Sequence, residues 1–224
     1  PSTQGLAATS GTFSTTLAVT GASTLSSSLA MTSDDPTITM TDSSGTNDIV
    51  KLQSTSGALI ITARDGNANG EIIFKGDTGS AVTEHMRINS IGAVTKPLQP
   101  AFLARVGTTQ SNLSTGTVVG FTNVIFDKGD DFASNVFTAP VAGQYQLNVQ
   151  LRVDALDTAS NYSRFYLKTS NRNYEVIFDL GGLSGDPAYW TMAITVLADM
   201  DASDTAFVEY NQSAGANQAD LQAN

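Results

Sequence analysis

Aromatic residues divide this chain of 224 residues into two unequal parts. Only Phe13 and Phe74 precede residue 98, whereas fifteen of the seventeen Phe, Trp and Tyr residues lie after it. Because large aromatic side chains supply much of the apolar surface that a core buries, only the second part can build an ordinary core within one chain. We therefore predict two regions, 1–97 and 98–224, of which the first needs neighbouring chains to fold.

Short repeated segments occupy the first region. Residues 12–20 (TFSTTLAVT) align position by position with residues 24–32 (TLSSSLAMT), at a spacing of twelve. Apolar residues within each copy alternate with polar ones, which is the period of a β-strand. Further short apolar runs, each bounded by turn residues, lie at 37–41, 49–52, 58–63, 71–75 and 85–88. The pattern predicts a fibrous shaft of short β units.

Longer strand patterns run through the second region. Residues 144–153 alternate between polar and apolar, which predicts a strand with one face on a core and the other in water. Residues 118–126 are largely apolar at both parities, which predicts a strand buried on both sides or at an interface. The expected strands are 101–106, 118–126 with 135–139, 144–153, 163–168, 174–180, 190–197 and 206–210. The fold class predicted for the whole chain is all-β.

The segment 121–149 resembles the core of the C1q/TNF-like jelly rolls. Phe126 stands where that family closes one strand with an aromatic, Phe-Thr-Ala-Pro at 137–140 ends the next, and Gly-Gln-Tyr at 143–145 opens the third. Leu147 stands where the family most often has Phe. The resemblance implies a jelly-roll head that packs as a homotrimer and serves as a recognition module.

The same resemblance raises an expectation about the chain end. The family closes its jelly roll with an eighth strand beside the first, and residues 221–224 do not look like such a strand. Because an uncovered strand edge is an aggregation hazard, we expect the natural protein to continue for roughly ten residues beyond Asn224. The alternative is that residues 95–100 cover this edge. The start at Pro1, without Met or a leader, likewise suggests a fragment or a processed product.

Two segments of the first region resemble the shafts of phage tail fibres: LAVTGASTL at 17–25 and TEHMRINSIGAV at 83–94. Together with the head they imply a non-enzymatic viral tail-fibre protein, extracellular on the virion, whose trimeric tip recognises a host surface glycan or protein during adsorption. Other tail or virion proteins would bind its N-terminal end. One alternative is a structural virion decoration or capping fibre without receptor binding. Another is a polysaccharide depolymerase.

Residues able to carry catalysis are sparse. The chain has one His, His85, and no Cys, and its Ser residues are spread through turns, so no Ser-His-Asp or Cys-His arrangement is visible. Glycoside hydrolysis needs two facing carboxylates, and the adjacent pairs 34–35 and 130–131 are better explained as turn residues. We expect His85 to face solvent or a subunit interface; the alternative is a ring of three His85 side chains that binds a metal or an anion.

No cofactor is expected. Residues 65–71 (DGNANGE) begin like an EF-hand loop, but Gly76 occupies the position that requires a bidentate Glu, so a turn is favoured. A divalent cation such as calcium at the tip has no motif in its support. The net charge of −10, with −3 before residue 98 and −7 after it, leaves no basic stripe, which argues against nucleic-acid binding. No apolar run approaches the roughly 20 residues of a membrane span, so no membrane insertion is expected.

Three connections are expected at the tip. If strand 101–106 leads away from the shaft, hairpin alternation places 154–162, 181–189 and 211–220 together at the far end. Aromatic, carboxylate and amide side chains on loops commonly bind sugars or protein surfaces. The candidate receptor-binding residues are Asp154, Asp157, Asn161, Tyr162, Asp186, Tyr189, Trp190, Gln212 and Asn217. The alternative for the three aromatics is a place in the core or at a subunit interface.

Overall fold

The computed structural model describes residues 29–42 and 44–223. The chain divides into two compact units, 1–72 and 73–224, so this division falls earlier than the boundary predicted at residues 97 and 98. Most of the repeat pair at 12–32 lies outside the described residues. Its last four residues, 29–32, form no strand.

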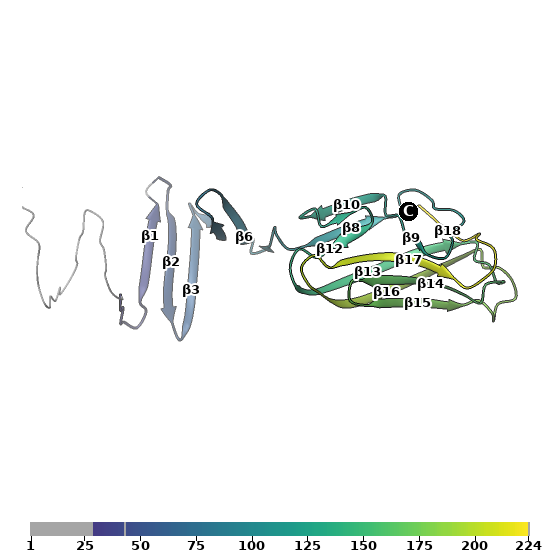
Figure 1. The fold of residues 1–224 in the computed structure, drawn as a ribbon. Coiled ribbons are helices and arrows are strands. Elements are labelled where there is room, and N and C mark those ends of the chain that lie inside the picture. The colour runs from purple at the N-terminus through teal and green to yellow at the C-terminus, as the bar shows by residue number, and fades with distance from the viewer. Residues whose placement is uncertain (1–28, 43, 224) are drawn as a thin grey trace, which may run out of the picture. The chain divides into compact units, whose positions relative to one another are not determined.

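The first unit contains one antiparallel sheet in the order β1-β2-β3-β4 (Figure 1). The strands are β1 (Thr37–Asp42), β2 (Asp48–Thr55), β3 (Ala58–Asp65) and β4 (Ala68–Asn69). Large apolar side chains of this sheet remain exposed, among them Ile38, Met40, Leu59, Ile60 and Ile61. The sheet therefore buries little of its apolar surface within the single chain.

The segment that begins like an EF-hand is the hairpin turn between β3 and β4. Arg64 pairs with Asn69 and Asp65 with Ala68, while Gly66 takes a left-handed φ of 59°. The Gly66 N–H donates to Asp48 Oδ1 at 2.6 Å. The turn prediction is therefore confirmed.

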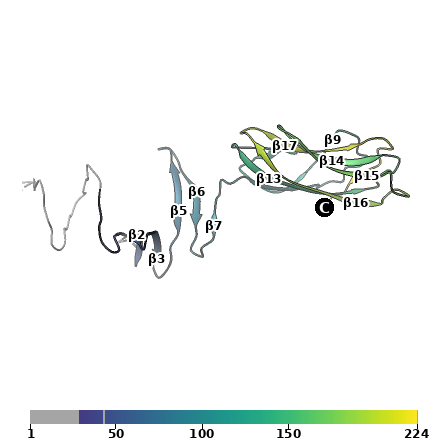
Figure 2. The same cartoon turned by 90° about the horizontal axis from the view of Figure 1, so that it is seen from below.

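The second unit begins with a small sheet in the order β5-β6-β7 (Figure 2). Its strands are β5 (Ile72–Asp77), β6 (Val82–Ile88) and β7 (Val94–Thr95). The His85 side chain is exposed, as expected, and lies over Gly76, where an added Cβ would come within 2.6 Å of His85 Cε1.

The remainder of the second unit, here called the head, is a two-sheet sandwich. One sheet has the order β11-β12-β17-β14-β15 with β9 beside β17, the other has the order β16-β13-β18, and β8 pairs with β10. The positions of β17 between β12 and β14, and of β13 between β16 and β18, give the Greek-key order of a jelly roll. Its strands are β8 (Ala101–Arg105), β9 (Thr117–Val118), β10 (Asn123–Lys128), β11 (Phe132–Ala133), β12 (Val136–Thr138), β13 (Gly143–Asp154), β14 (Tyr162–Thr169), β15 (Asn173–Asp179), β16 (Tyr189–Met200), β17 (Thr205–Gln212) and β18 (Asp220–Leu221).

The core lies between the two sheets. Alternate residues of β13 and β14 point into it, so the alternation predicted over 144–153 is confirmed. The largest side chains that are almost wholly buried include Tyr210, Phe165, Leu156, Leu180 and Leu221. Stacked rings of Phe102, Phe132 and Phe137 extend the core, with centroids 4.6 and 5.2 Å from Phe102.

The segment 118–126 is not one strand. β9 pairs with β17, whereas β10 pairs with β8 and carries a register shift between Val124 and Phe126. This bulge interrupts the alternation, so Val124, Ile125 and Phe126 are all about half exposed in the single chain.

The chain end corrects a second expectation, because residues 220–221 do form a strand. Leu221 pairs with Val153 of β13 and forms an isolated bridge with Gln110. Two hydrogen bonds hold the residues before Leu221 in position: Leu113 N–H donates to the Ala219 carbonyl at 2.8 Å, and Asn112 N–H donates to Asp220 Oδ1 at 2.8 Å. Two residues are too few for a strand pattern to be visible in the sequence.

Candidate functional site

The three connections expected at one end of the head do meet there. Asn161 N–H donates to Ser213 Oγ at 2.9 Å, which joins the first connection to the third. Asp186 in the second connection bonds both Thr158 in the first and Gln218 in the third. We call the three connections, 155–161, 180–188 and 213–219, the loop cluster.

Asp186 holds the loop cluster together. Its Oδ1 accepts from the Thr158 N–H at 2.8 Å and from the Thr158 hydroxyl at 2.6 Å, and its Oδ2 accepts from Gln218 Nε2 at 3.1 Å. The Thr158 hydroxyl, the Thr158 N–H and Gln218 together lower the pKa of the Asp186 carboxyl. A carboxylate that already accepts three hydrogen bonds acts first as a connector between loops.

Gln212 shapes the third connection from inside. This side chain is only 8% exposed. Its Nε2 donates to the carbonyls of Ala214 and Ala216 at 3.1 and 3.0 Å, and it lies 3.3 Å from Asn217 Oδ1. Gln212 therefore lies below the surface, which corrects the prediction that it is an exposed receptor contact. The side-chain oxygen of Asn217 points toward Gln212.

A buried hydroxyl supports Gln212 in turn. Tyr210 Oη donates to Gln212 Oε1 at 2.9 Å and accepts from Ser163 Oγ at 3.2 Å. Burial raises the pKa of the Tyr210 phenol, so the ring keeps its proton and remains a donor. The three side chains form a buried polar chain below the loop cluster.

Asp157 closes the first connection onto the third. Its carboxylate accepts from the Ala159 N–H at 2.8 Å and from the Ala216 N–H. Gly215, with a left-handed φ of 80°, lets the chain pass next to this carboxylate. Asp157 is thus a second connector between loops.

Tyr189 is the most exposed aromatic of the predicted set, at 67%. It lies directly opposite Asp154 across the β13–β16 pair, and Arg152 stands on the same face two residues before Asp154. The Arg152 guanidinium carbon is 5.4 Å from the Tyr189 ring centroid, and Arg152 Nε and Nη2 donate to the Asp154 oxygens at 2.7 and 2.9 Å. We call Arg152, Asp154 and Tyr189 the Tyr189 patch, which consists of an exposed aromatic ring beside a guanidinium group and a carboxylate.

The other two aromatics do not join this patch. Trp190 has the inward parity of β16 and stacks on Phe178, with centroids 4.1 Å apart, but it remains 41% exposed, so it lies at the rim of the core. Tyr162 lies on the outer face of β14, in the opposite sheet, where Arg164 is 4.8 Å from its ring. Of the three aromatics, Trp190 comes nearest to the alternative prediction of a place in the core. Tyr162 faces away from Tyr189.

Several residues of this end were missed from the sequence. Arg152 could have been found, because it shares the parity of Asp154 in a clean alternating strand. Thr158 and Gln218 gave no signal, since a hydrogen bond between loops depends on backbone placement rather than on spacing.

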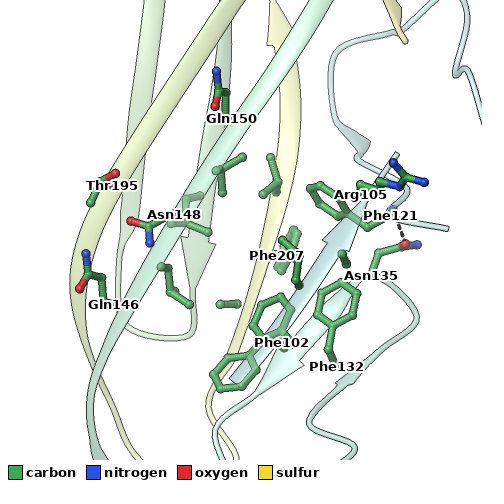
Figure 3. A pocket seen from close by; sticks show the side chains of 18 of the residues that line it. Phe102, Arg105, Phe121, Phe132, Asn135, Gln146, Asn148, Gln150, Thr195 and Phe207 are labelled. Atoms are coloured by element: carbon green, nitrogen blue, oxygen red, sulfur yellow. Dashed lines mark hydrogen bonds between the residues drawn. The ribbon is translucent and has the colours of Figure 1, made fainter. Parts of the chain in front are cut away.

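A groove opens on the side of the head, apart from the loop cluster (Figure 3). Its volume is about 540 Å³, and its lining residues come chiefly from β8 and β13. Gln146, Asn148 and Gln150 stand along one side, whereas Phe121 and Phe132 lie on the other.

Residues 29–42 and 44–223 contain no group of three or more His, Asp or Glu side chains placed to hold a metal ion, and no helix that could span a membrane. The Asp130–Asp131 pair lies in the turn after β10, where Asp130 has a φ of 57°. Burial, with the neighbouring Asp127 and Asp130 carboxylates, raises the pKa of Asp131. The turn prediction accounts for this pair.

Comparison with known proteins finds similar solved structures only. No family model matches the chain, and no curated protein matches it. Among solved structures, the globular domain of zebrafish complement 1qA protein is similar at 20% identity and a TM-score of 0.41, over 55% of this chain and 92% of that one. An exo-β-1,3-galactanase from Phanerochaete chrysosporium, solved with galactose, is similar at 11% identity and a TM-score of 0.22, over 84% of this chain and about half (54%) of that one. The assignment of the head as an all-β jelly roll rests on its own strand order.

Proposed function

We propose that this protein is a phage tail-fibre protein whose head contacts the host surface through the Tyr189 patch and the loop cluster beside it. The observation that carries the proposal is an exposed ring, a guanidinium and a carboxylate on a rigid strand pair, next to three loops that fix one another. Aromatic and Arg side chains on rigid elements are the usual anchors of recognition. On this proposal the protein is extracellular on the virion, and other virion proteins hold its N-terminal end.

We further propose that the working form is a homotrimer. Two sets of exposed apolar side chains support this proposal. One set lies on the sheet β1-β2-β3-β4, and the other lies on the outside of the head: Leu103, Val124, Ile125, Phe126 and Leu197. Exposed apolar surface of this kind marks an association site. Light scattering tests the assembly, with an expected mass of three times the chain mass of 23.4 kDa. A well-folded monomer would refute both the trimer and the shaft.

Binding of the purified protein to envelope from candidate host cells tests recognition. We expect Tyr189→Ala to weaken binding by about 30-fold, the effect of truncating an anchor worth about 2 kcal/mol. Tyr162→Ala is the matched control, because it removes the same ring from the opposite outer face, and it should leave binding unchanged. Equal losses in both variants would show that the Tyr189 patch is not the contact.

A structural decoration fibre is the second candidate. The use of Asp157, Asp186 and Gln212 to connect loops favours it, because such a cluster can serve as a rigid cap. This candidate predicts a trimer that binds none of the host envelopes, so the same measurement separates the two functions.

A further inference from the structure

One outer face of the head carries a row of uncharged amides. Gln146, Asn148 and Gln150 alternate with core residues along β13, so all three point outward, and all three are exposed (Figure 3). We call these three residues the amide stripe. Their partners across the β13–β16 pair are Leu197, Thr195 and Ala193.

The amide stripe runs directly into the Tyr189 patch. Gln150 precedes Arg152 by two residues on β13, so the two side chains are neighbours on one face. The residue opposite Arg152 is Thr191, whose side chain is small. From Gln146 to Asp154 the face extends for about 27 Å, at about 3.4 Å per residue. It is therefore long enough to hold several units of a chain-like ligand.

The charges at the two ends of this face are already paired. Arg152 Nε and Nη2 donate to the Asp154 oxygens at 2.7 and 2.9 Å, so the guanidinium fork is occupied. At the other end Asp199, which lies opposite Gln144, accepts from Arg172. Between these two pairs neither β13 nor β16 has a charged residue. A carboxylate or phosphate on a ligand would thus meet no unpaired cation on this face, which favours a neutral ligand.

The chemistry of the amide stripe matches hydroxyl groups. Within the described part of the chain, none of its three amides has a hydrogen-bond partner. An amide donates from its nitrogen and accepts with its oxygen, and a sugar hydroxyl likewise donates and accepts. An apolar ligand would instead strip water from the amides and leave them unsatisfied. The C–H face of a sugar ring can also stack on Tyr189, which is 67% exposed.

A protein partner fits this face less well. Protein interfaces bury an apolar centre. Here the large aliphatic side chain, Leu197, lies opposite Gln146, at the end of the amide stripe that is farther from Tyr189. The middle of the face, where Asn148 pairs with Thr195, is polar.

We propose that the amide stripe and the Tyr189 patch bind a neutral oligosaccharide that lies along β13 and β16. This inference rests on the proposed function, since it names the class of host receptor that the Tyr189 patch contacts. Tyr189 stacks on one sugar ring, and the amides bind hydroxyl groups of the sugars that follow it.

The first test uses host envelope that the parent protein binds. Mild periodate cleaves the vicinal diols of sugars, whereas protease digests proteins. We expect periodate to abolish binding, protease to leave it unchanged, and the polysaccharide fraction that passes through an anion-exchange column to compete for the protein. Raising NaCl from about 50 to about 500 mM should change the affinity less than about twofold, because a neutral ligand offers no charge to screen.

Other outcomes of this test separate the inference from the proposed function. Loss of binding after protease alone, or competition only by the acidic fraction that the column retains, would overturn the inference while the proposed function stands. Binding to none of the host envelopes would refute the proposed function, and the inference with it.

The second test changes the amide stripe itself. Asn148→Ala should weaken binding to the envelope about five- to tenfold, the effect of losing a hydrogen bond or two. Asn173→Ala is the matched control, because Asn173 is an exposed amide of outward parity on β15, in the other sheet, and it should leave binding unchanged. Equal losses in the two variants would overturn the inference.

Asn148→Lys distinguishes a ligand contact from a contact between copies of the chain. The longer, charged side chain should abolish binding to the envelope, while the mass measured by light scattering stays that of the parent protein. A change in this mass would show that the amide stripe is an interface between copies, and would overturn the inference.

Discussion

Removal of the Tyr210 hydroxyl tests whether the buried polar chain holds the loop cluster. Tyr210→Phe takes away the donor to Gln212 Oε1 and the acceptor of Ser163 Oγ, while the ring and its packing against Phe165 stay. Tyr210 is 1% exposed and Ser163 0%, so no water reaches the abandoned partners without rearrangement. Two hydrogen bonds are lost at about 1 kcal/mol each, so we expect the free energy of unfolding to fall by about 2 kcal/mol.

Urea unfolding at a fixed protein concentration measures this loss. Adding Ser163→Ala to Tyr210→Phe removes the stranded hydroxyl, so the double variant should be more stable than the sum of the two single losses implies, by about 1 kcal/mol. A Tyr210→Phe protein within about 0.5 kcal/mol of the parent would refute the reasoning, as would strict additivity of the two substitutions.

Further predictions concern the loop cluster and the two regions. Folding lowers the pKa of Asp186, so its carboxylate stabilises the folded protein above the ordinary pKa of 3.8, and this stabilisation is lost as the pH falls through the lowered value. The stability of Asp186→Asn should therefore depend less on pH between about pH 5 and 2. Unfolding monitored by tryptophan fluorescence measures this dependence. Gly215→Ala should destabilise the protein by about 1–2 kcal/mol, because the residue has a positive φ and its Cβ would meet the Asp157 carboxylate; a Tm equal to that of the parent would contradict this. In circular dichroism, isolated residues 98–224 should keep β-structure whereas 1–97 should not melt cooperatively; the reverse result would overturn the assignment of the two regions.

Features of the head that depend on strand period and turn residues could be predicted from the sequence. The strands β8, β13, β14, β15 and β17 lie within about two residues of their predicted ends, because alternation and Gly or Pro punctuation are local. The meeting of the three loops could be deduced from hairpin alternation alone.

Features that depend on backbone placement could not be predicted in this way. The sequence assigned Gln212 to the surface, although the side chain turns inward to bond main-chain carbonyls. It grouped Tyr162 with Tyr189, although the two rings occupy outer faces of different sheets. The two-residue strand at Asp220–Leu221 is too short to have a period, and only its pairing with β13 makes it visible.

The loop cluster separates the side chains that keep its shape from those that it displays. Asp157 and Gln212 bond mainly to main-chain N–H and C=O groups, whereas Asp186 also bonds the side chains of Thr158 and Gln218. Exposed positions 182–185 form none of these bonds, and a Cβ at Gly182 or Gly185 would meet only open space. A combinatorial library, or natural divergence, can therefore diversify these positions and change the chemistry presented there while the framework of the loops is inherited unchanged.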